Sequence, residues 1–360
     1  MAVTGNKGEW SEMYALFKLL GEGKVHAGDA DMNKLDLYYP IINIIREETK
    51  RYEYMPNSER KIVVVNEDGE EFACIPMERF LSESKHLIEA IKASSKGTFA
   101  VPQSESFMAE IGCERLKAPS KDKTDIRIVI HDLRTNMTPL LGFSIKSQLG
   151  SPSTLLNAGE STNILYKVEG CSLTDNEIAE INNIEEHNDR MKAIKDKGCS
   201  FVYADVENAT FKNNLLFLDC CMPELVADCL LPYYTEQSSA SLKDAVKKIA
   251  NINPIGFTGK DVLSFYEHKM KVLLLDAALG MTPAKPWSGR YDANGGYLVV
   301  KNDGDIVCYH FYNRNDVEDY LYNNTRFERA SRSRHHFGSL FRGADNNVYI
   351  RFNLQIRFKK

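Results

Sequence analysis

The chain has 360 residues, of which 43% are hydrophobic and 26% charged, and its formal net charge is −5. A disordered chain would carry fewer apolar residues and a larger net charge, so this composition predicts a packed core in one elaborate domain or two smaller ones. No run approaches the roughly 18 apolar residues of a membrane-spanning helix, and the start, MAVTGNKGEWSE, lacks the apolar segment of a signal peptide. We therefore expect a cytoplasmic protein with no membrane partner.

The eight cysteines are spread along the chain without a CxxC pair. Cytoplasmic proteins rarely keep disulfides, and zinc frameworks usually combine cysteines at short, paired spacings. The spacing therefore predicts reduced thiols, mostly in the core. Cys220 and Cys221 lie in the apolar run LLFLDCCMPELVADCLL, which predicts a buried position for both.

Apolar spacing predicts helices and a hairpin in the first hundred residues. Met13, Leu16 and Leu20 recur at helical spacing, so residues 10–20 should form an amphipathic helix. Residues 35–45 are also expected to be helical, although Pro40 must start or kink that helix. The next expected elements are a hairpin of strands 61–65 and 71–75 around Asn66-Glu67-Asp68-Gly69, and a helix over 82–92.

The middle of the chain predicts two adjacent strands. In TDIRIVIHD, isoleucines alternate with Arg127 and Val129, and Pro139 then leads into LLGFSIKS. This alternation is typical of half-buried strands, so residues 125–131 and 140–147 should form two strands that pair antiparallel.

The second half predicts helices followed by further strands. The expected elements are an exposed helix or helical pair over 172–197, apolar segments over 214–228 and 262–280 (the latter a core helix), a linker or long loop over 281–296, a hairpin of strands 297–300 and 306–311, and a strand-like end over 348–358. Together the elements indicate an α/β or α+β architecture.

Basic residues are concentrated near the C-terminal end. Residues 326–360 hold nine Lys or Arg against two Asp or Glu, a local charge of +7, whereas the remaining chain carries −12. Arginine predominates, and its planar guanidinium suits phosphates and guanine edges, whereas lysine is the usual solubilising cation. The block predicts a surface that meets a polyanion, and a solvated face is the alternative.

Asp125 and Lys146 are the candidates for chemistry. Asp125 begins the first middle strand and Lys146 lies near the end of the second, so pairing would bring a carboxylate and an ammonium to one edge of the sheet. Metal-dependent phosphodiester hydrolysis needs carboxylates that hold Mg²⁺ against a phosphate oxygen, and a lysine that positions or helps deprotonate the attacking water. This spacing alone is a weak signal.

Several longer segments, spread from end to end of the chain, are informative when taken together. They are GNKGEWSE (5–12), TDIRIVIHD (124–132), LGFSIKSQLGSPSTLLNAGESTN (141–163), NRNDVEDYLYNNTRFERASRSRHHFG (313–338) and NLQIRF (353–358). Together these segments resemble the HpaII-type restriction endonucleases. The resemblance implies a PD-(D/E)xK nuclease fold, in which a mixed sheet is flanked by helices. It also implies Mg²⁺-dependent cleavage of double-stranded DNA and a target such as 5′-CCGG in a restriction-modification system.

The resemblance leads to expectations about organisation and partners. Residues 1–280 should form the nuclease core, with catalytic strands near 124–147 and helical insertions, and residues 281–360 an Arg-rich DNA-recognition region with closing strands. Two cuts in a palindrome are most simply made by a homodimer on DNA, although a monomer could nick each strand in turn. A cognate DNA methyltransferase would act in the same system without stable contact.

The motif departs from the family pattern in two places. Thr124 stands where the motif has Pro, and Ser144 stands at the acidic position of Ser144-Ile145-Lys146, which leaves the metal one carboxylate short. Other restriction enzymes with Ser at this position use a Glu about fourteen residues past the Lys, and Glu160 has that offset. Alternatively, Glu160 caps a helix or faces water.

The first helix offers another carboxylate. Lys7-Gly8 followed by Glu12 matches a KGxxxE pattern of archaeal-type nucleases that resemble the same fold, in which the Glu points at the metal. Glu9 lies on nearly the same helical face, and both could instead be capping or solvated residues of a first turn. The predicted catalytic set is Asp125, Lys146, Glu12, Glu160 and Ser144; the predicted Mg²⁺ ligands are Asp125, Glu12, Glu9 and Glu160.

Recognition of a DNA target made of G and C bases needs guanidinium groups that bind guanine and hydrogen-bond acceptors for the amino group of cytosine. Some of the candidates must hold phosphates instead. The predicted DNA contacts are Gln148, Ser151, Asn313, Arg314, Asn324, Arg326, Arg329, Arg332 and Arg334. We thus expect a type II restriction endonuclease that uses in-line attack of water. The alternatives are a structure-selective or repair nuclease of the same fold, and a sequence-specific DNA-binding protein that does not cut.

Overall fold

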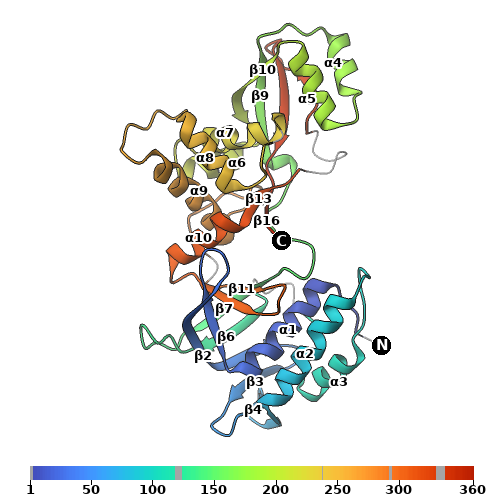
Figure 1. The fold of residues 1–360 in the computed structure, drawn as a ribbon, viewed down its shortest axis with the longest axis vertical. Coiled ribbons are helices and arrows are strands. Elements are labelled where there is room, and N and C mark those ends of the chain that lie inside the picture. Colours follow the sequence, from blue (N-terminus) through green and yellow to red (C-terminus); the bar gives the residue numbers. More distant parts are fainter. Residues whose placement is uncertain (1–2, 118–123, 237, 292–293, 330–336) are drawn as a thin grey trace. The chain divides into compact units, whose positions relative to one another are not determined.

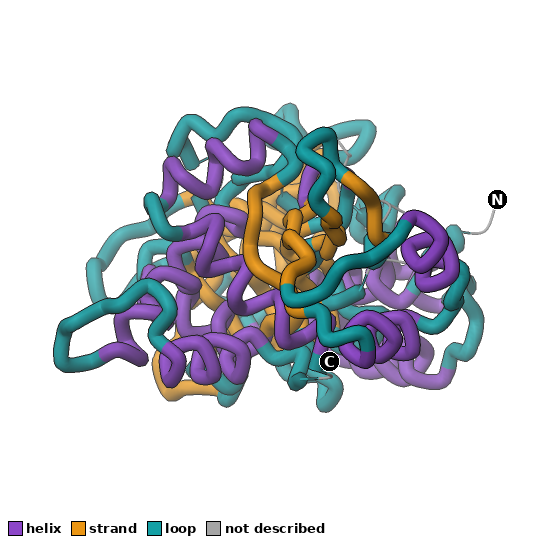
Figure 2. The backbone as a smooth tube through the Cα atoms, turned by 90° about the horizontal axis from the view of Figure 1, so that it is seen from above, coloured by secondary structure: helices purple, strands orange, loops and turns teal. Residues whose placement is uncertain are grey.

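The computed structural model describes residues 3–117, 124–236, 238–291, 294–329 and 337–360. Helices and strands both contribute substantially to this part of the chain, as Figure 2 shows, so the mixed α/β class expected from the sequence is confirmed. The chain divides into two compact units (Figure 1). The first unit is Met1–Ser153 and Asp292–Tyr320 with Lys360, and the second is Thr154–Tyr291 and Leu321–Lys359.

The units divide the chain differently from the two regions expected from the sequence. The boundaries fall after residues 153 and 291 and within the helix α10, rather than near residue 280. The second boundary does lie in the Pro- and Gly-rich segment 281–296, whose described residues form a long loop up to β11, which begins at Gly296. The roles that we assigned to 1–280 and 281–360 remain predictions.

The first unit is built on a nine-stranded sheet of order β1-β12-β11-β7-β6-β2-β3-β4-β5. The long strand β2 also pairs with β1, and the strands β1, β12, β11, β7, β6 and β2 thus form a closed ring of pairings. The elements are α1 (Lys7–Glu22), β1 (Lys24–Gly28), β2 (Lys34–Glu47), β3 (Arg51–Pro56), β4 (Lys61–Asn66), β5 (Glu71–Pro76), α2 (Met77–Ala93), α3 (Pro102–Glu110), β6 (Ile126–Ile130), β7 (Leu140–Ser147), β11 (Gly296–Val300), β12 (Ile306–His310) and the start of α10 (Arg314–Asn324).

The strand β2 corrects the helix expected over residues 35–45. β-branched and aromatic residues dominate this segment, and they pack well on a pleated surface. Pro40, which has no N–H to donate, sits where β2 changes partner: residues before it pair with β1 and residues after it pair with β6. The carbonyl of Pro40 is still used, because it accepts a hydrogen bond from the N–H of His131 at 2.8 Å. Tertiary pairing therefore outweighs the helical spacing.

The other expected elements of the first unit are confirmed. The strands β6 and β7 pair antiparallel, with Ile126 opposite Phe143. The hairpins β4–β5 and β11–β12 and the helices α1 and α2 also form.

The helix α1 is the hydrophobic centre of the first unit. It packs against α2, beside which it lies in Figure 1, and against β7. Trp10, Leu16 and Phe17 are fully buried, and the indole N–H of Trp10 donates to the carbonyl of Phe99 at 2.9 Å. Burial of each large apolar side chain contributes roughly 1.5–3 kcal/mol, so this helix is held firmly against the sheet.

The second unit contains two smaller sheets and a group of helices. The sheets have the orders β10-β9-β15-β14 and β13-β16-β8. The expected helical pair over 172–197 appears as α4 and α5, and the expected core helix as α9. The elements are β8 (Thr154–Leu156), η1 (Glu160–Thr162), β9 (Asn163–Glu169), α4 (Asp175–Asn182), α5 (His187–Asp196), β10 (Ser200–Val206), α6 (Ala209–Leu218), α7 (Met222–Thr235), α8 (Leu242–Ile252), α9 (Val262–Ala278), the end of α10, β13 (Thr325–Phe327), β14 (Leu340–Arg342), β15 (Val348–Asn353) and β16 (Ile356–Phe358).

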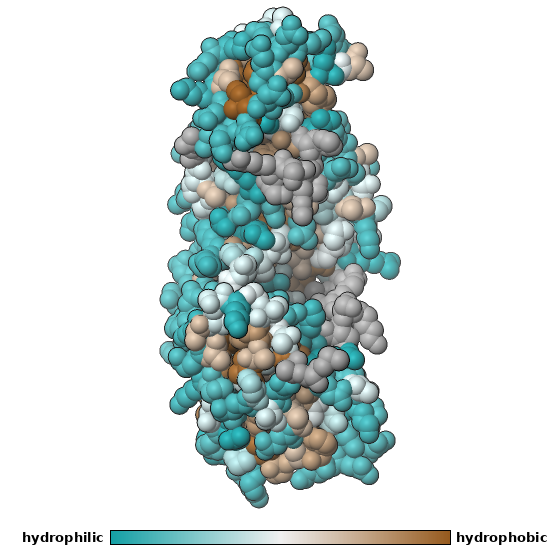
Figure 3. Space-filling model, turned by 90° about the vertical axis from the view of Figure 1, so that its right-hand side faces the viewer, coloured by the Kyte–Doolittle hydropathy of each residue, from teal (hydrophilic) through white to brown (hydrophobic). Residues whose placement is uncertain are grey.

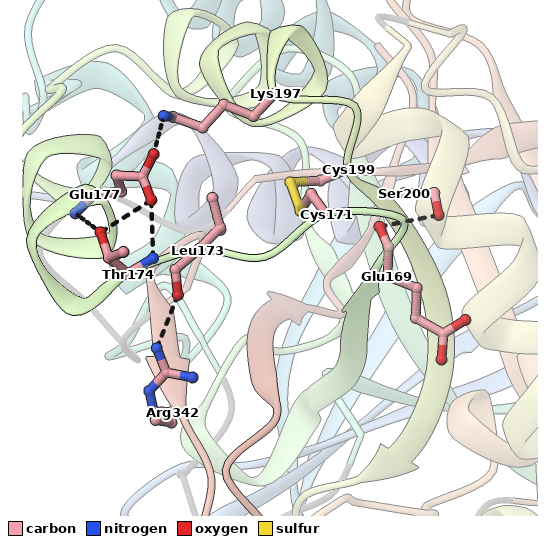
Figure 4. The surroundings of a disulfide bond; sticks show 9 residues. All are labelled: Glu169, Cys171, Leu173, Thr174, Glu177, Lys197, Cys199, Ser200 and Arg342. Atoms are coloured by element: carbon pink, nitrogen blue, oxygen red, sulfur yellow. Dashed lines mark hydrogen bonds and ion pairs between the residues drawn. A yellow bond between two sulfur atoms is a disulfide. The ribbon is translucent and has the colours of Figure 1, made fainter.

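The cysteines correct the expectation of free, mostly buried thiols in two places. A disulfide joins Cys171, just after β9, to Cys199, just before β10 (Figure 4). The antiparallel pairing of β9 with β10 brings these positions together, which their separation of 28 residues does not reveal. In addition, Cys220 is exposed and Cys221 partly exposed, because both lie between α6 and α7 rather than inside a helix.

No helix in the described ranges is long and apolar enough to cross a membrane. Hydrophilic residues cover most of the face shown in Figure 3, and hydrophobic residues form smaller separate areas.

The disulfide yields a prediction about stability. Replacing Cys171 and Cys199 together by Ser should lower the free energy of unfolding of the air-oxidised protein by about 2–4 kcal/mol, because the cross-link restricts the unfolded chain. Urea unfolding with and without reductant measures this: reductant should destabilise the wild type and leave the double variant unchanged. Cys74→Ser is the control, and equal midpoints for wild type and double variant would contradict the bond.

Candidate active site

Three predicted residues come together in the first unit, at the edge where β6 begins and β7 ends. Asp125 directly precedes β6, Lys146 lies near the end of β7, and Glu12 projects from α1, which packs on β7. Their charges act on one another: Asp125 on Glu12, and both carboxylates on Lys146. The expectation that strand pairing joins a carboxylate to an ammonium is therefore met, and the first helix supplies a second carboxylate.

Asp125 is fixed by both its backbone and its side chain. Its N–H donates to the carbonyl of Phe143 at 2.9 Å, and its Oδ2 accepts the N–H of Ile145 at 2.6 Å. Burial raises the pKa of the carboxyl group, while the bond from Ile145 and the charge of Lys146 act in the opposite direction. One carboxylate oxygen is thereby anchored to the strand that carries the lysine.

Lys146 lies in a partly buried position against an aromatic ring. Its Nζ is 5.2 Å from the ring centroid of Tyr297, a cation–π contact with the neighbouring strand β11. Burial lowers the pKa of the ammonium, and Asp125 and Glu12 partly oppose that shift. At neutral pH a larger fraction of this lysine is therefore neutral than of a lysine in water.

Glu12 is the most strongly perturbed carboxyl group of the site. Burial, and then repulsion from Asp125, raise its pKa to about 8. Its Oε2 is buried and finds no hydrogen-bond donor among the described residues. A buried acceptor without a donor is costly, so this oxygen is poised for a ligand that supplies positive charge.

The site suits a divalent metal ion. Carboxylate oxygens are the ligands that Mg²⁺ prefers, and Asp125 and Glu12 each offer one. A cation between them would remove their mutual repulsion and satisfy Glu12 Oε2. The small cavity beside Asp125 is not this metal position, because two arginines line it and neither Glu12 nor Lys146 does. Its lining residues are Ile45, Arg46, Glu47, Thr124, Asp125, Ile126 and Arg127.

Two serines that the sequence analysis missed connect the elements of the site. Ser11 Oγ and Ser147 Oγ lie 2.8 Å apart, and Ser11 Oγ also donates to the carbonyl of Lys7 at 2.6 Å. The Ser147 hydroxyl must therefore donate to Ser11, while it accepts the N–H of Leu149 at 3.1 Å. This chain of bonds ties the neighbour of Glu12 to the neighbour of Lys146. No sequence signal marks it, since isolated serines are common.

Glu9 takes the capping role that the sequence left open as an alternative. Its N–H and carboxylate form a reciprocal capping box with Asn6, and its Oε1 pairs with Lys117 Nζ at 3.0 Å. The Asn6 backbone bond is the main cause that lowers the pKa of Glu9. Because both oxygens are engaged, Glu12 is better placed than Glu9 to bind a metal.

Ser144 occupies the expected strand position. Antiparallel pairing of Ile126 with Phe143 puts Ser144 opposite Asp125, and Ser144 shares a face of β7 with Lys146 two residues later. A hydroxyl at this point is a weaker metal ligand than a carboxylate. Ser144 therefore supplies no carboxylate at the acidic position of the motif.

Glu160 belongs to the second unit, where it begins the short helix η1 and is exposed. It lines a polar cavity of about 490 Å³. The lining residues are Glu160, Ser161, Asn163, Glu207, Asn208 and Arg351. Its predicted role in metal binding remains a prediction.

Comparison with known proteins bears on the activity. The model of the HpaII restriction endonuclease family matches residues 6–358. The chain is also 42% identical over 358 residues to the type II restriction enzyme HpaII of Haemophilus parainfluenzae. The aligned region covers 99% of this chain and 98% of that enzyme. The chain belongs to the HpaII restriction endonuclease family. No solved structure gives a significant match.

Membership of the HpaII restriction endonuclease family confirms the resemblance seen in the sequence. It makes the chain a site-specific deoxyribonuclease that acts on double-stranded DNA, as restriction endonucleases do. Type II restriction endonucleases generally use a divalent metal ion, in keeping with the donor set of Asp125 and Glu12.

The predicted DNA contacts of this family member are divided between the units. Gln148, Ser151, Asn313 and Arg314 belong to the first unit, and Asn324, Arg326 and Arg329 to the second. Arg332 and Arg334 lie outside the described residues.

Some of these side chains already have protein partners. Gln148 Oε1 accepts the N–H of Asn302, and Asn313 donates to the hydroxyl of Tyr39. Ser151 is exposed, whereas Asn324 is only 8% exposed.

The three described arginines of the set differ in their surroundings. Arg314 pairs with Glu318 and Arg326 with Glu328. Arg329 lies over the ring of Tyr233, 5.4 Å from its centroid. Arg326 could exchange its carboxylate for DNA at small cost, because that ion pair is partly exposed. Release of Arg314 would cost more, because its partner Glu318 is buried and would be left without its cation.

The repulsion at Glu12 yields a prediction. Because its pKa rises to about 8 on folding, the metal-free protein should lose stability as pH rises from about 4.5 to 8, over which the unfolded chain ionises Glu12 and the folded chain does not. Glu12→Gln should therefore raise the free energy of unfolding at pH 8 by up to about 4–5 kcal/mol, since the rise spans roughly 3.5 pKa units of about 1.4 kcal/mol each.

Urea unfolding in a chelator at pH 5 and pH 8 tests this. Glu89→Gln, on the exposed face of α2, is the control and should have little effect at either pH. Added Mg²⁺ should stabilise the wild type more than Glu12→Gln. Equal stability of Glu12→Gln and wild type at pH 8 would contradict the prediction.

Proposed function

We propose that this member of the HpaII restriction endonuclease family cuts 5′-CCGG in a Mg²⁺-dependent reaction on a PD-(D/E)xK core. The observation that carries the assignment of the site is the cluster of Glu12, Asp125 and Lys146, in which partly buried carboxylates adjoin a lysine of lowered pKa. The target rests on the resemblance to the HpaII-type enzymes and on 42% identity to HpaII.

Asp125 and Glu12 are proposed to hold the metal ion. Glu160 is proposed to supply the further carboxylate, because Ser144 stands at the acidic position of the motif and has none. When bound there, Mg²⁺ supplies positive charge that offsets the charge developing on the phosphate oxygens. The bond from the Ile145 N–H keeps one oxygen of Asp125 in place. Ser11 and Ser147 keep α1 at a fixed position against β7.

Lys146 is proposed to orient or deprotonate the attacking water. Its lowered pKa increases the fraction of neutral amine, which can accept the proton of the water as the oxygen attacks phosphorus. Attack in line with the scissile bond then releases the 3′-oxygen of the neighbouring nucleotide. The products carry 5′-phosphate and 3′-hydroxyl ends.

Recognition of the DNA sequence is proposed to depend on arginines and on neighbouring polar residues. Guanidinium groups can bind O6 and N7 of guanine, and the remaining cations would hold phosphates. The proposed contacts are Gln148, Ser151, Asn313, Arg314, Asn324, Arg326, Arg329, Arg332 and Arg334. A homodimer on the palindrome, action in the cytoplasm and a cognate methyltransferase without stable contact complete the proposal.

The proposal predicts discrete cleavage of plasmid DNA in Mg²⁺. Sequenced ends should lie at CCGG, and Asp125→Ala or Lys146→Ala should lower the cleavage rate by about 100- to 1,000-fold or more, because each removes a charged group from the reacting centre. The two alternatives from the sequence predict other outcomes. Cuts dictated by DNA shape would indicate a structure-selective nuclease, and selective binding without products a DNA-binding protein. Discrete cuts elsewhere would overturn only the target.

Glu160 is tested separately. If its carboxylate joins the metal site, Glu160→Gln should reduce cleavage by orders of magnitude while DNA binding, measured by gel shift in Ca²⁺, survives. Glu180→Gln, on the exposed face of α4 in the same unit, should leave both unchanged. Unimpaired cleavage by Glu160→Gln would remove this residue from the site.

A further inference from the structure

The connection between α6 and α7 in the second unit brings together two thiols and a carboxylate. Asp219, Cys220 and Cys221 fill this connection, and one potential ligand atom from each lies within 4.8 Å of the others. The two sulfur atoms are 3.7 Å apart. Nothing in the proposed nuclease mechanism uses these groups.

The spacing of the two sulfurs matches a tetrahedral metal site. Zinc binds thiolate sulfur at about 2.3 Å, and two such bonds at the tetrahedral angle place the sulfurs about 3.8 Å apart. A carboxylate oxygen at about 2.0 Å from the same ion would lie about 3.5 Å from each sulfur. The free protein thus already holds its thiols at nearly the distance that the bound ion requires.

The backbone of the connection orders these side chains. The N–H of Cys221 donates to Asp219 Oδ1 at 2.8 Å, and the N–H of Met222 donates to the carbonyl of Asp219 at 3.0 Å. Cys221 is also the N-cap residue of α7, and its carbonyl accepts the N–H of Leu225 at 2.9 Å. Asp219 and Cys221 would therefore lose little conformational freedom on binding.

The local charges are balanced for a divalent ion. Two thiolates and one carboxylate carry −3, and a divalent cation leaves −1. The ammonium of Lys269 on α9, which pairs with Asp219 Oδ2, supplies the compensating positive charge. The carboxylate oxygens retain lone pairs for a metal, since each accepts one hydrogen bond here.

Solvent exposure distinguishes Cys220 and Cys221 from most of the other free cysteines. Cys220 is exposed and Cys221 partly exposed, whereas Cys113, Cys229 and Cys308 are buried. Cys74 is exposed but does not belong to the cluster.

We propose that Asp219, Cys220 and Cys221 bind a thiophilic divalent cation, zinc above all, through two thiolates and one carboxylate, with solvent at the fourth position. Binding releases the two thiol protons. The site lies wholly in the second unit, uses softer ligands than the Mg²⁺ site and is independent of the proposed nuclease mechanism. Occupancy would clamp the connection between α6 and α7.

Cobalt titration of the reduced-thiol, full-length protein tests the proposal. With Mg²⁺ in excess to occupy hard oxygen sites, Co²⁺ should produce a thiolate-to-cobalt charge-transfer band and the intense visible bands of tetrahedral cobalt, and Zn²⁺ should abolish both. Cys220→Ser and Cys221→Ser should each weaken binding at least about 100-fold. The control Cys74→Ser should bind like the wild type.

Further variants keep the test decisive. Asp219→Asn should retain the charge-transfer band but bind more weakly, because both sulfurs remain. Wild-type protein without the band, or a band that survives both Cys220→Ser and Cys221→Ser, would overturn the proposal. Urea unfolding of each variant shows that it folds, and cleavage assays report on the nuclease site separately, since these residues take no part in it.

Discussion

The antiparallel pairing of β6 with β7 is the constraint on which the candidate active site depends. It sets Asp125 opposite Ser144, delivers the Ile145 N–H to the Asp125 carboxylate and places Lys146 at the same edge of the sheet. A shift of one residue would send every side chain of β7 to the opposite face. The parallel strand β11 then adds Tyr297 beside the lysine, and the charged groups become partly desolvated.

Desolvation explains both the cost and the use of this arrangement. Two carboxylates that repel each other, one with a buried oxygen that has no donor among the described residues, destabilise the metal-free fold. The large apolar surface of α1 and the Ser11–Ser147 bond offset that cost and keep Glu12 in position. A divalent cation bound between these carboxylates, as proposed, would relieve the repulsion, and the relief would add to its affinity.

The elements that could be predicted from the sequence are those whose signal lies in residues close together along the chain. Local alternation revealed β6, β7 and both hairpins, and helical spacing revealed α1, α2 and α9, since each signal lies within a few residues. The helix expected over residues 35–45 was wrong because pairing with β1, β3 and the distant strand β6 outweighs local spacing. The Cys171–Cys199 bond and the exposure of Cys220 were missed for a related reason. Both depend on how helices and strands pack in the folded chain, and the spacing of cysteines along the sequence does not reveal that packing.

By itself the sequence determined the family, the mixed α/β class and the choice of Asp125, Lys146 and Glu12, because these rest on motifs and on patterns of short range. Only the tertiary structure decided that Glu9 caps α1 while Glu12 faces Asp125, and that Glu160 belongs to the second unit. Residues three apart on one helix look alike in a sequence. Their environments differ because packing against β7 buries one carboxylate and leaves the other to bond Asn6 and Lys117, and such burial is set by elements far away along the chain.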